Sequence, residues 1–243
     1  MKSVDIAFPV YRGNLHEIEP TIKKVSQYCQ KNLKNYNWHL VLGINGWGAE
    51  EVIALSKRLE KQNSRVKHCY NEAPGKGAGL HLAWSQSKAD IVAYMDIDLS
   101  VDIKDLPTLL EELKTYDICV GSRYHKGSNV ERSFMRKLAS WVYHKIIQQL
   151  LLGTKCEDLH CGFKAFRREV AQKLLPYVQD PGWFFDTEIM TLAEKLGYSI
   201  KTIPILWNEG KNSGLSLKRV VPAFIMKNIE LRLRPLPTHM RKK

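Results

Sequence analysis

Two acids stand two positions apart at Asp96 and Asp98, directly after the apolar run Ile91–Met95. In an extended segment, side chains two residues apart point to the same side, so this pair could hold Mg²⁺ or Mn²⁺ together with water and a diphosphate. A metal there would neutralise charge on a departing nucleoside diphosphate. The alternative is two solvated loop acids, and the position after a buried strand favours the metal site.

Lys76 lies between two glycines in the segment Pro74–Ala78, where a helix is expected to begin. A lysine at such a place can meet phosphate with its ammonium group and with the free backbone N–H groups of the helix start. The segment is not a P-loop, because the first glycine and the Ser or Thr after the lysine are missing. For this segment taken alone, a simple turn is therefore the favoured interpretation.

A basic stretch follows Gly121, and its arginines suit phosphate because a guanidinium group can bind two oxygens. The stretch contains Arg123, Lys126, Arg132, Arg136 and Lys137, with one acid, Glu131. A solvated helix face would explain some of these residues equally well. Further along, Asp158 could be a general base, an acid of the metal network or a helix cap. Asp186 and Glu188 are expected near the start of a helix, where negative charge is favoured.

The first half of the chain alternates short apolar runs with helical spacing, which predicts βαβ units and a parallel sheet. The expected strands are Val4–Val10, His39–Ile44, Val66–Tyr70 and Ile91–Met95. Continuous apolar strands indicate a sheet covered on both faces, with ligands bound at the carboxyl ends of the strands. The loops Pro9–Tyr11, Asn45–Gly48, Asn71–Gly77 and Asp96–Ser100 should therefore share one crevice.

The second half is less regular. Strands are expected at Asp117–Gly121, Cys161–Phe166 and Ser199–Trp207, and Pro204 predicts an edge position for the last of these. Helices are expected at Arg132–Leu152, Phe185–Leu196 and Leu217–Leu233. We interpret residues 1–214 as a single α/β domain and residues 215–243 as a basic amphipathic appendage.

The charge is uneven along the 243 residues. The net charge is +12, and residues 215–243 contribute eight Lys or Arg and one acid, which is +7. A basic amphipathic helix in this segment is typical of an element that binds an anionic membrane surface. Packing on the domain, on a partner subunit or in a homo-oligomer explains the same pattern equally well. Nucleic acid is disfavoured as a partner, because no recognised binding motif is present and aromatic residues do not alternate with the basic ones.

Five cysteines, an odd number, indicate reduced thiols and a cytoplasmic protein. No signal peptide is expected at the start, and no apolar stretch is long enough for a transmembrane segment. The protein could still be peripheral on the cytoplasmic face of a membrane through residues 215–243.

Taken in order, these segments resemble the family 2 glycosyltransferases, and within them the polyprenyl-phosphate (dolichyl-phosphate) sugar synthases. The resemblance covers Val4 to Trp207. It rests on Phe8–Tyr11, Gly75–Ala78, Met95–Ser100, Gly121–Tyr124, Asp158 with Cys161–Lys164, and Phe184–Glu188. It implies a GT-A fold, with a mostly parallel central sheet flanked by helices, and an inverting, metal-dependent transfer of a hexose such as glucose or mannose from a UDP- or GDP-sugar.

On the donor side, the resemblance implies that Pro9, Tyr11 and Lys76 line the nucleotide. Asp96 and Asp98 would hold the diphosphate and its Mg²⁺ or Mn²⁺. Asn45 stands where the family usually has an acid that contacts the base and ribose. An amide both donates and accepts hydrogen bonds, whereas a carboxylate only accepts them, so nucleotide binding could differ here.

On the acceptor side, the resemblance implies that Arg123 and Arg132 face the phosphate of a polyprenyl-phosphate acceptor. Asp158 would lie close to the reaction centre, so Asp98, Asp158 and Arg123 are the expected catalytic residues. Two alternatives stay open. A glycan or other hydroxyl acceptor would need a base, for which Asp158 is the candidate. A catalytically silent module would bind a sugar nucleotide without transferring the sugar.

Overall fold

The computed structural model of the protein describes residues 1–131, 141–208 and 217–235. The strands are β1 (Lys2–Val10), β2 (Tyr36–Asn45), β3 (Val66–Asn71), β4 (Ile91–Met95), β5 (Ile118–Ser122), β6 (Asn129–Glu131), β7 (Phe163–Arg167), β8 (Ile200–Pro204) and β9 (Leu206–Asn208). The α-helices are α1 (Leu15–Asn32), α2 (Glu50–Gln62), α3 (Lys76–Gln86), α4 (Leu106–Glu111), α6 (Gln149–Leu152), α7 (Arg168–Leu174), α8 (Phe185–Lys195) and α9 (Leu217–Leu233).

Seven strands form the central sheet in the order β3-β2-β1-β4-β7-β5-β8. The pairs β3-β2, β2-β1, β1-β4 and β5-β8 are parallel, and β7 runs antiparallel to both of its neighbours. The expected α/β fold with a mostly parallel sheet is therefore confirmed. Since β7 is reversed, its amino end lies at the same edge of the sheet as the carboxyl ends of β4 and β5.

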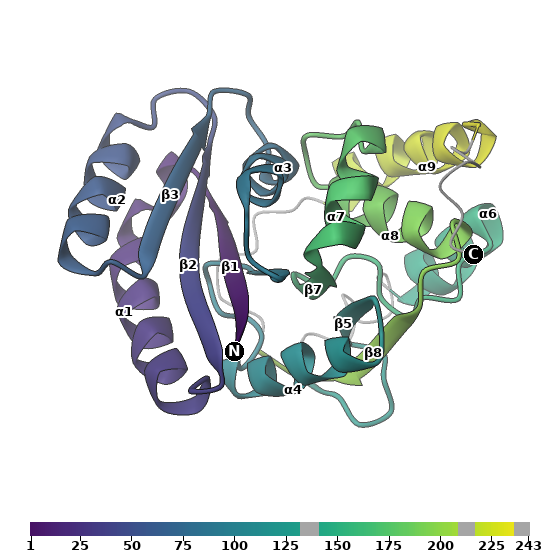
Figure 1. The fold of residues 1–243 in the computed structure, drawn as a ribbon. Coiled ribbons are helices and arrows are strands. Elements are labelled where there is room, and N and C mark those ends of the chain that lie inside the picture. The colour runs from purple at the N-terminus through teal and green to yellow at the C-terminus, as the bar shows by residue number, and fades with distance from the viewer. Residues whose placement is uncertain (132–140, 209–216, 236–243) are drawn as a thin grey trace.

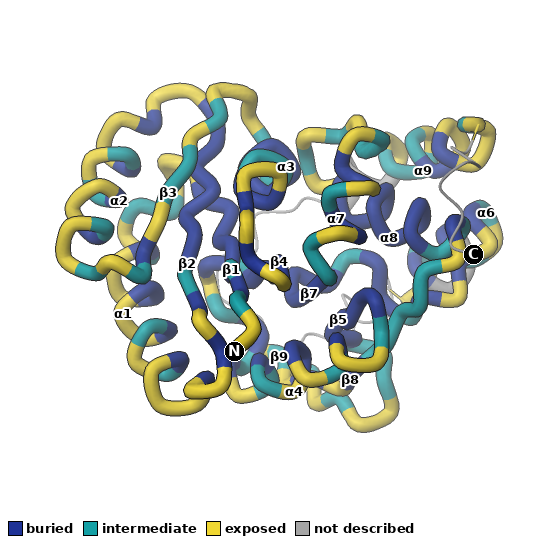
Figure 2. The backbone as a smooth tube through the Cα atoms, in the orientation of Figure 1, coloured by how far each residue is buried: buried dark blue, intermediate teal, exposed yellow. Residues whose placement is uncertain are grey.

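Helices cover both faces of the first half of the sheet. α1 and α2 lie on one side of β1–β3, and α3 lies on the other side (Figure 1). The buried strands form the dark interior of the tube in Figure 2, where β4 is buried at every residue because it is apolar throughout. α3 approaches β2 closely: a Cβ added to Gly79 would lie 2.4 Å from the carbonyl oxygen of Gly43. This contact fixes the start of α3, where Lys76 lies.

One expectation for the second half needs correction. The strand expected at Ser199–Trp207 is two strands: β8 at the edge of the main sheet, as Pro204 predicts, and β9, which pairs with β6. A long helix is expected at Arg132–Leu152, and its residues 132–140 lie outside the described part of the chain. Its described part contains a π-helix, Tyr143–Gln148, followed by the single turn of α6. None of the described helices is both long and apolar enough to cross a bilayer.

The described part of the basic appendage, α9, packs against the rest of the protein. Phe224 stacks on His160 with the ring planes 10° apart, and Leu231 is buried. Three of its basic residues are also engaged: Lys227 pairs with Asp180, Arg234 pairs with Glu188, and Arg232 donates to the carbonyls of Leu150 and Leu151. These cations hold the helix on the domain, so they are less available for a membrane surface than the sequence indicated.

Candidate active site

The loops after β1, β2, β3 and β4 are linked by polar contacts at one edge of the sheet. The Asn45 side chain donates from Nδ2 to the carbonyl oxygen of Val10 at 2.9 Å, and its Oδ1 accepts from the backbone N–H of Gly75 at 3.0 Å. Lys76 Nζ then lies 2.9 Å from Asp96 Oδ1. The structure thus brings the four loops together, as the strand pattern predicts.

Three residues expected at the nucleotide have different surroundings. Pro9 is buried within β1, opposite Gly43 of β2. Asn45 is 6% exposed, and both ends of its amide are bonded to the backbone. Its side chain therefore joins loops, and the amide expected to contact the base is already occupied. Tyr11 is 53% exposed and presents its ring to solvent.

The start of α3 meets a second loop. Gly77 N–H donates to the carbonyl of Gly182 at 3.3 Å, and Ala78 N–H donates to the carbonyl of Pro181 at 2.9 Å. These two N–H groups are therefore not free for phosphate. The sequence had indicated that backbone N–H groups at this helix start could bind it. Phosphate could meet the Lys76 ammonium here, but not these two backbone groups.

Asp96 and Asp98 lie on a turn and not on an extended segment. Leu99 has a φ of 50°, which places a non-glycine residue in the left-handed region. As a result the two acids differ: Asp98 is exposed and its Oδ1 accepts from Ser100 N–H at 3.0 Å, whereas Asp96 turns inward. A Cβ at Gly162 would lie 1.8 Å from Asp96 Oδ2, so only glycine allows this approach of β7 to the turn.

Behind Asp96 lies a buried cluster of charges. Lys76 Nζ, 2.9 Å from Asp96 Oδ1, is also 3.3 Å from Asp186 Oδ2. Lys164 Nζ lies 2.8 Å from the other oxygen of Asp186, Oδ1, to which the Tyr94 hydroxyl also donates. Lys164 and Tyr94 are fully buried, and Asp186 is 2% exposed. Two cations and two anions therefore balance one another beneath the turn.

The pKa shifts in this cluster follow from burial and pairing. Burial would raise the pKa of Asp186, but the charges of Lys164 and Lys76 outweigh it and lower the pKa to about 2. Burial would lower the pKa of Lys76, but Asp186 and Asp96 raise it above its usual value. For Asp96 burial dominates and raises the pKa, although Lys76 opposes the shift. Lys76 and Asp186 are therefore charged at neutral pH.

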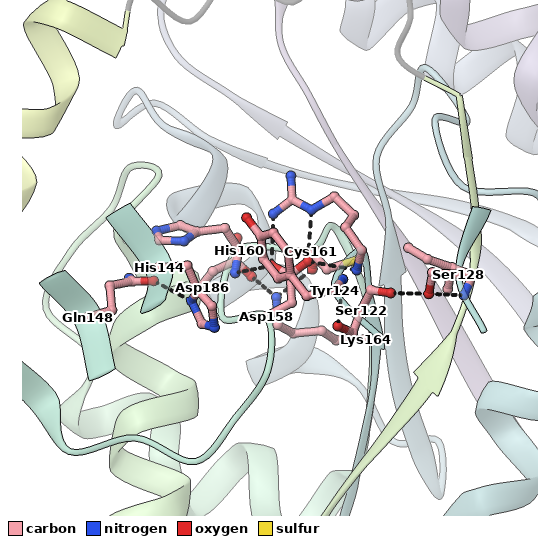
Figure 3. Close-up of polar contacts among 12 residues, drawn as sticks. Ser122, Tyr124, Ser128, His144, Gln148, Asp158, His160, Cys161, Lys164 and Asp186 are labelled. Atoms are coloured by element: carbon pink, nitrogen blue, oxygen red, sulfur yellow. Dashed lines mark hydrogen bonds and ion pairs between the residues drawn. The ribbon is translucent and has the colours of Figure 1, made fainter. Parts of the chain in front are cut away.

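The sequence reasoning did not assign functional roles to Lys164 and Asp186. Lys164 stands in the otherwise apolar run Phe163–Phe166, and a charged residue in a buried strand is a signal of a buried partner. Asp186 looked like an ordinary acid at a helix start. In the structure it is in the first turn of α8, and its carboxylate points to Lys164, as Figure 3 shows.

Arg123 and Asp158 form a second, closed pair. Arg123 Nε donates to Asp158 Oδ2 and Nη2 donates to Oδ1, both at 2.8 Å, and the backbone N–H of Arg123 adds a third bond at 3.0 Å. The side chains are 13% and 1% exposed. Burial would raise the pKa of Asp158, but Arg123 outweighs it and holds the pKa well below its usual range. Arg132, the other expected acceptor residue, lies outside the described residues.

A chain of polar side chains continues from this pair through the backbone N–H of His160, which donates to Asp158 Oδ1 (Figure 3). His160 Nε2 lies 2.9 Å from Thr187 Oγ1, which also accepts from Gln148 Nε2 at 3.2 Å. Gln148 in turn contacts the ring of His144. Burial lowers the pKa of His160 to about 3, although Asp186 and Asp158 oppose the shift. His160 is therefore neutral at physiological pH.

The donor set at the turn fits a hard divalent cation. Asp98 is open to solvent, and the Asp96 side chain is 28% exposed. Mg²⁺ or Mn²⁺ is commonly held by one or two carboxylates, with water and phosphate oxygens as the remaining ligands. No group of three or more His, Cys, Asp or Glu suited to a metal occurs among the described residues. A metal here would therefore depend on these two acids and on oxygens from a ligand.

The family model described as glycosyl transferase family 2 matches residues 5–175, more than two thirds of the chain. The chain belongs to this family. The matched part of this family 2 chain contains Lys76, Asp96, Asp98, Arg123 and Asp158, and it ends before Asp186 and before α9.

Two curated relatives have the same sequence identity to this chain. Glycosyltransferase AglD of Haloferax volcanii is 27% identical over 219 residues, which is 89% of this chain and 35% of that protein. The dolichyl-phosphate beta-glucosyltransferase of Dictyostelium discoideum is 27% identical over 226 residues, 87% of this chain and 68% of that protein. The chain thus spans about a third of the first relative and about two thirds of the second.

The fold resembles that of a solved enzyme. The crystal structure of glucosyl-3-phosphoglycerate synthase from Mycobacterium tuberculosis, in complex with Mn²⁺, UDP and glucosyl-3-phosphoglycerate, superposes with a TM-score of 0.65. The two sequences are 14% identical, and the match covers 95% of this chain and 80% of that one. At this identity the likeness is one of fold, and the expected GT-A fold is confirmed.

Proposed function

We propose that this domain transfers a hexose, glucose or mannose, from a UDP- or GDP-sugar to the phosphate of a polyprenyl phosphate, using Mg²⁺ or Mn²⁺. The observation that carries the proposal is the meeting of the exposed Asp98, Asp96 and the Lys76 ammonium at one edge of the sheet. Two anions and a cation suit a divalent ion with a diphosphate. Membership of family 2 and the dolichyl-phosphate glucosyltransferase relative support the reaction class.

On the donor side, Asp96 and Asp98 would hold the metal. When bound, the metal supplies positive charge to the diphosphate leaving group. Lys76, whose ammonium lies 2.9 Å from Asp96, would reach the same oxygens, and burial strengthens its attraction for them. Solved structures of the mycobacterial enzyme contain Mn²⁺ or Mg²⁺ together with UDP, which supports this choice of ion.

The surroundings of Asp158 favour a phosphate acceptor over a hydroxyl acceptor. A hydroxyl group needs a base, and an efficient base has a pKa near the working pH. Asp158 is bound by Arg123 through both oxygens, and its pKa is held far below that range. A phosphate oxygen is already ionised and needs no base. It would attack the anomeric carbon opposite the bond to the diphosphate, and that bond would break with inversion.

A transfer assay tests this proposal. The protein is incubated with radiolabelled UDP-glucose or GDP-mannose, Mn²⁺, and either a polyprenyl phosphate or a glycan acceptor. We expect labelled polyprenyl-phosphate hexose, and no product when the metal is chelated. Label in the glycan alone would instead identify a hydroxyl acceptor. Mn²⁺-dependent binding of UDP, seen as a rise in melting temperature without transfer to either acceptor, would identify a silent binding module.

We further propose that the outward face of α9 meets an anionic membrane surface, where a polyprenyl phosphate would be presented. Phe224 and Leu231 face the domain, whereas Met226, Ile229 and Leu233 follow helical spacing and are exposed. Lys227, Arg232 and Arg234 are engaged with the domain, so the remaining basic residues of 215–243 support anionic lipid as the partner: Lys218, Arg219, Arg241, Lys242 and Lys243.

The test replaces Met226, Ile229 and Leu233 together by serine. Sedimentation with vesicles that contain anionic lipid should fall for this variant, and transfer to a water-soluble short-chain acceptor should be unchanged. Unchanged sedimentation would remove the membrane proposal. If light scattering shows that the unaltered protein is a dimer and the variant is a monomer, the face binds a second copy of the chain.

A further inference from the structure

Lys76 is shared between two acids with different roles. Its ammonium lies 2.9 Å from Asp96, an acid of the proposed metal site, and 3.3 Å from Asp186, which is buried 2.8 Å from Lys164. The Lys76 side chain is 8% exposed, so water can replace neither partner fully. A divalent cation that binds Asp96 therefore has to compete with this ammonium.

We propose that Asp186 is a positioning residue that keeps the Lys76 ammonium paired when a divalent cation displaces it from Asp96, and so determines how readily Asp96 binds that cation. The inference rests on the proposed function, because it takes Asp96 to be a metal ligand. Asp186 itself does not touch the metal in this proposal; it acts through Lys76.

The Asp186 carboxylate is held in place beside Lys76 by two neighbouring side chains. Its Oδ1 is fixed by the Tyr94 hydroxyl from β4 and by Lys164 from β7, while Oδ2 is directed to Lys76. Lys164 is fixed in turn by the carbonyl of Cys161 at 2.5 Å. Figure 3 shows Lys164, Cys161 and Asp186 gathered at this point. One oxygen of Asp186 thus anchors the carboxylate, and the other is left for Lys76.

The charges of the cluster account for the effect. Lys76 and Lys164 balance Asp96 and Asp186 when no metal is bound. When a divalent cation binds Asp96, Lys76 loses that partner but keeps Asp186, so its buried charge stays compensated. Without the negative charge of Asp186, Asp96 would be the remaining anion in contact with Lys76 in the described part of the chain, and the ammonium would resist displacement.

Mn²⁺ binding in the presence of UDP, measured from the electron paramagnetic resonance signal of free Mn²⁺, tests this directly and requires no turnover. We expect Asp186→Asn to weaken Mn²⁺ binding about 10- to 100-fold, the range typical for residues that support metal ligands. Lys164→Met should instead strengthen Mn²⁺ binding, because Asp186 then has Lys76 as its main cationic partner. A purely structural role for the cluster would weaken binding in both variants.

Asp186→Asn leaves Lys164 buried beside a neutral amide, and this variant could fail to fold. The double variant Lys164→Met/Asp186→Asn removes the charges of both residues. Lys76 is retained, but it no longer has Asp186 as an anionic partner. It should fold and still show the weakened Mn²⁺ binding. Asp117→Asn is the matched control: Asp117, which precedes β5, is also a buried acid, but it accepts hydrogen bonds from Ser199, which precedes β8, and should leave Mn²⁺ affinity unchanged.

Besides weakened binding in both single variants, two further results would overturn the inference, and they are distinguishable. If the unaltered protein binds Mn²⁺ with UDP and the double variant binds it equally well, Asp186 does not control Asp96, while the proposed function stands. If the unaltered protein does not bind Mn²⁺ with UDP at all, the proposed metal site fails and the inference fails with it.

Discussion

Asp98 and Asp158 are both acids on loops at the same edge of the sheet, yet their surroundings are opposite. Asp98 is exposed and accepts a hydrogen bond from its own turn, whereas Asp158 is 1% exposed and accepts from three N–H groups of Arg123. An exposed carboxylate keeps oxygens free for a ligand. In the buried pair both carboxylate oxygens are already bonded by Arg123, so we expect this pair mainly to stabilise the fold. From this contrast we predict that ligand binding depends on Asp98 and that Asp158 mainly supports the fold.

The largest effect that would test this contrast is on activity. Asp98→Asn should lower sugar transfer by roughly 100- to 1000-fold or more, because one metal-binding carboxylate is lost. Its free energy of unfolding should change by less than about 0.5 kcal/mol, since the side chain is exposed. Asp102→Asn is the control, because Asp102 also accepts from its own turn, at Lys104 N–H. Metal-dependent transfer at the normal rate in Asp98→Asn would break the comparison.

Asp158→Asn should show the reverse pattern, with its main effect on stability. The change leaves the buried Arg123 without a counter-charge, so the free energy of unfolding should fall by about 3–5 kcal/mol. Urea denaturation followed by circular dichroism measures this. The double variant Arg123→Met/Asp158→Leu should recover much of the loss. If Asp158→Asn is as stable as the unaltered protein but inactive, Asp158 belongs with Asp98 as a chemical group.

Asn45→Asp tests whether position 45 supports the fold or binds the nucleotide, because it introduces the acid that the family usually has there. A carboxylate cannot donate to the Val10 carbonyl as Nδ2 of Asn45 does, so we expect a loss of about 1–3 kcal/mol in the free energy of unfolding. Asn37→Asp, on the exposed start of the same strand, should cost less than about 0.5 kcal/mol. A rise in nucleotide affinity without loss of stability in Asn45→Asp would show that position 45 contacts the base.

The effect expected to be smallest at neutral pH is a pH dependence from His160. The pKa of His160 is lowered to about 3 in the folded protein, against about 6.5 in an unfolded chain. Between these values the unfolded chain binds more protons, so the free energy of unfolding falls as the pH drops, by at most about 1.4 kcal/mol per pH unit from this group. His160→Gln should reduce that slope between pH 6.5 and 4.5 in urea titrations. An identical slope would show that His160 is protonated in the folded state.

Much of the framework follows from local pattern. Apolar runs such as Ile91–Met95 form strands because their side chains must be buried on both faces of a sheet, and their order along the chain predicts parallel pairing. Asp96, Asp98 and Lys76 could be placed at one edge because the carboxyl ends of parallel strands meet there. The GT-A fold and the family are confirmed. The roles of individual site residues stay predictions.

Tertiary structure alone decided which charges meet. β7 runs antiparallel, and its reversed direction brings Asp158 to Arg123, Gly162 to Asp96 and Lys164 to Asp186. No spacing in the sequence encodes these contacts, because strand direction depends on how the whole sheet packs. The same holds for Asn45: its residue type was visible from the start, but only the folded loops show that its amide is bonded at both ends by the backbone.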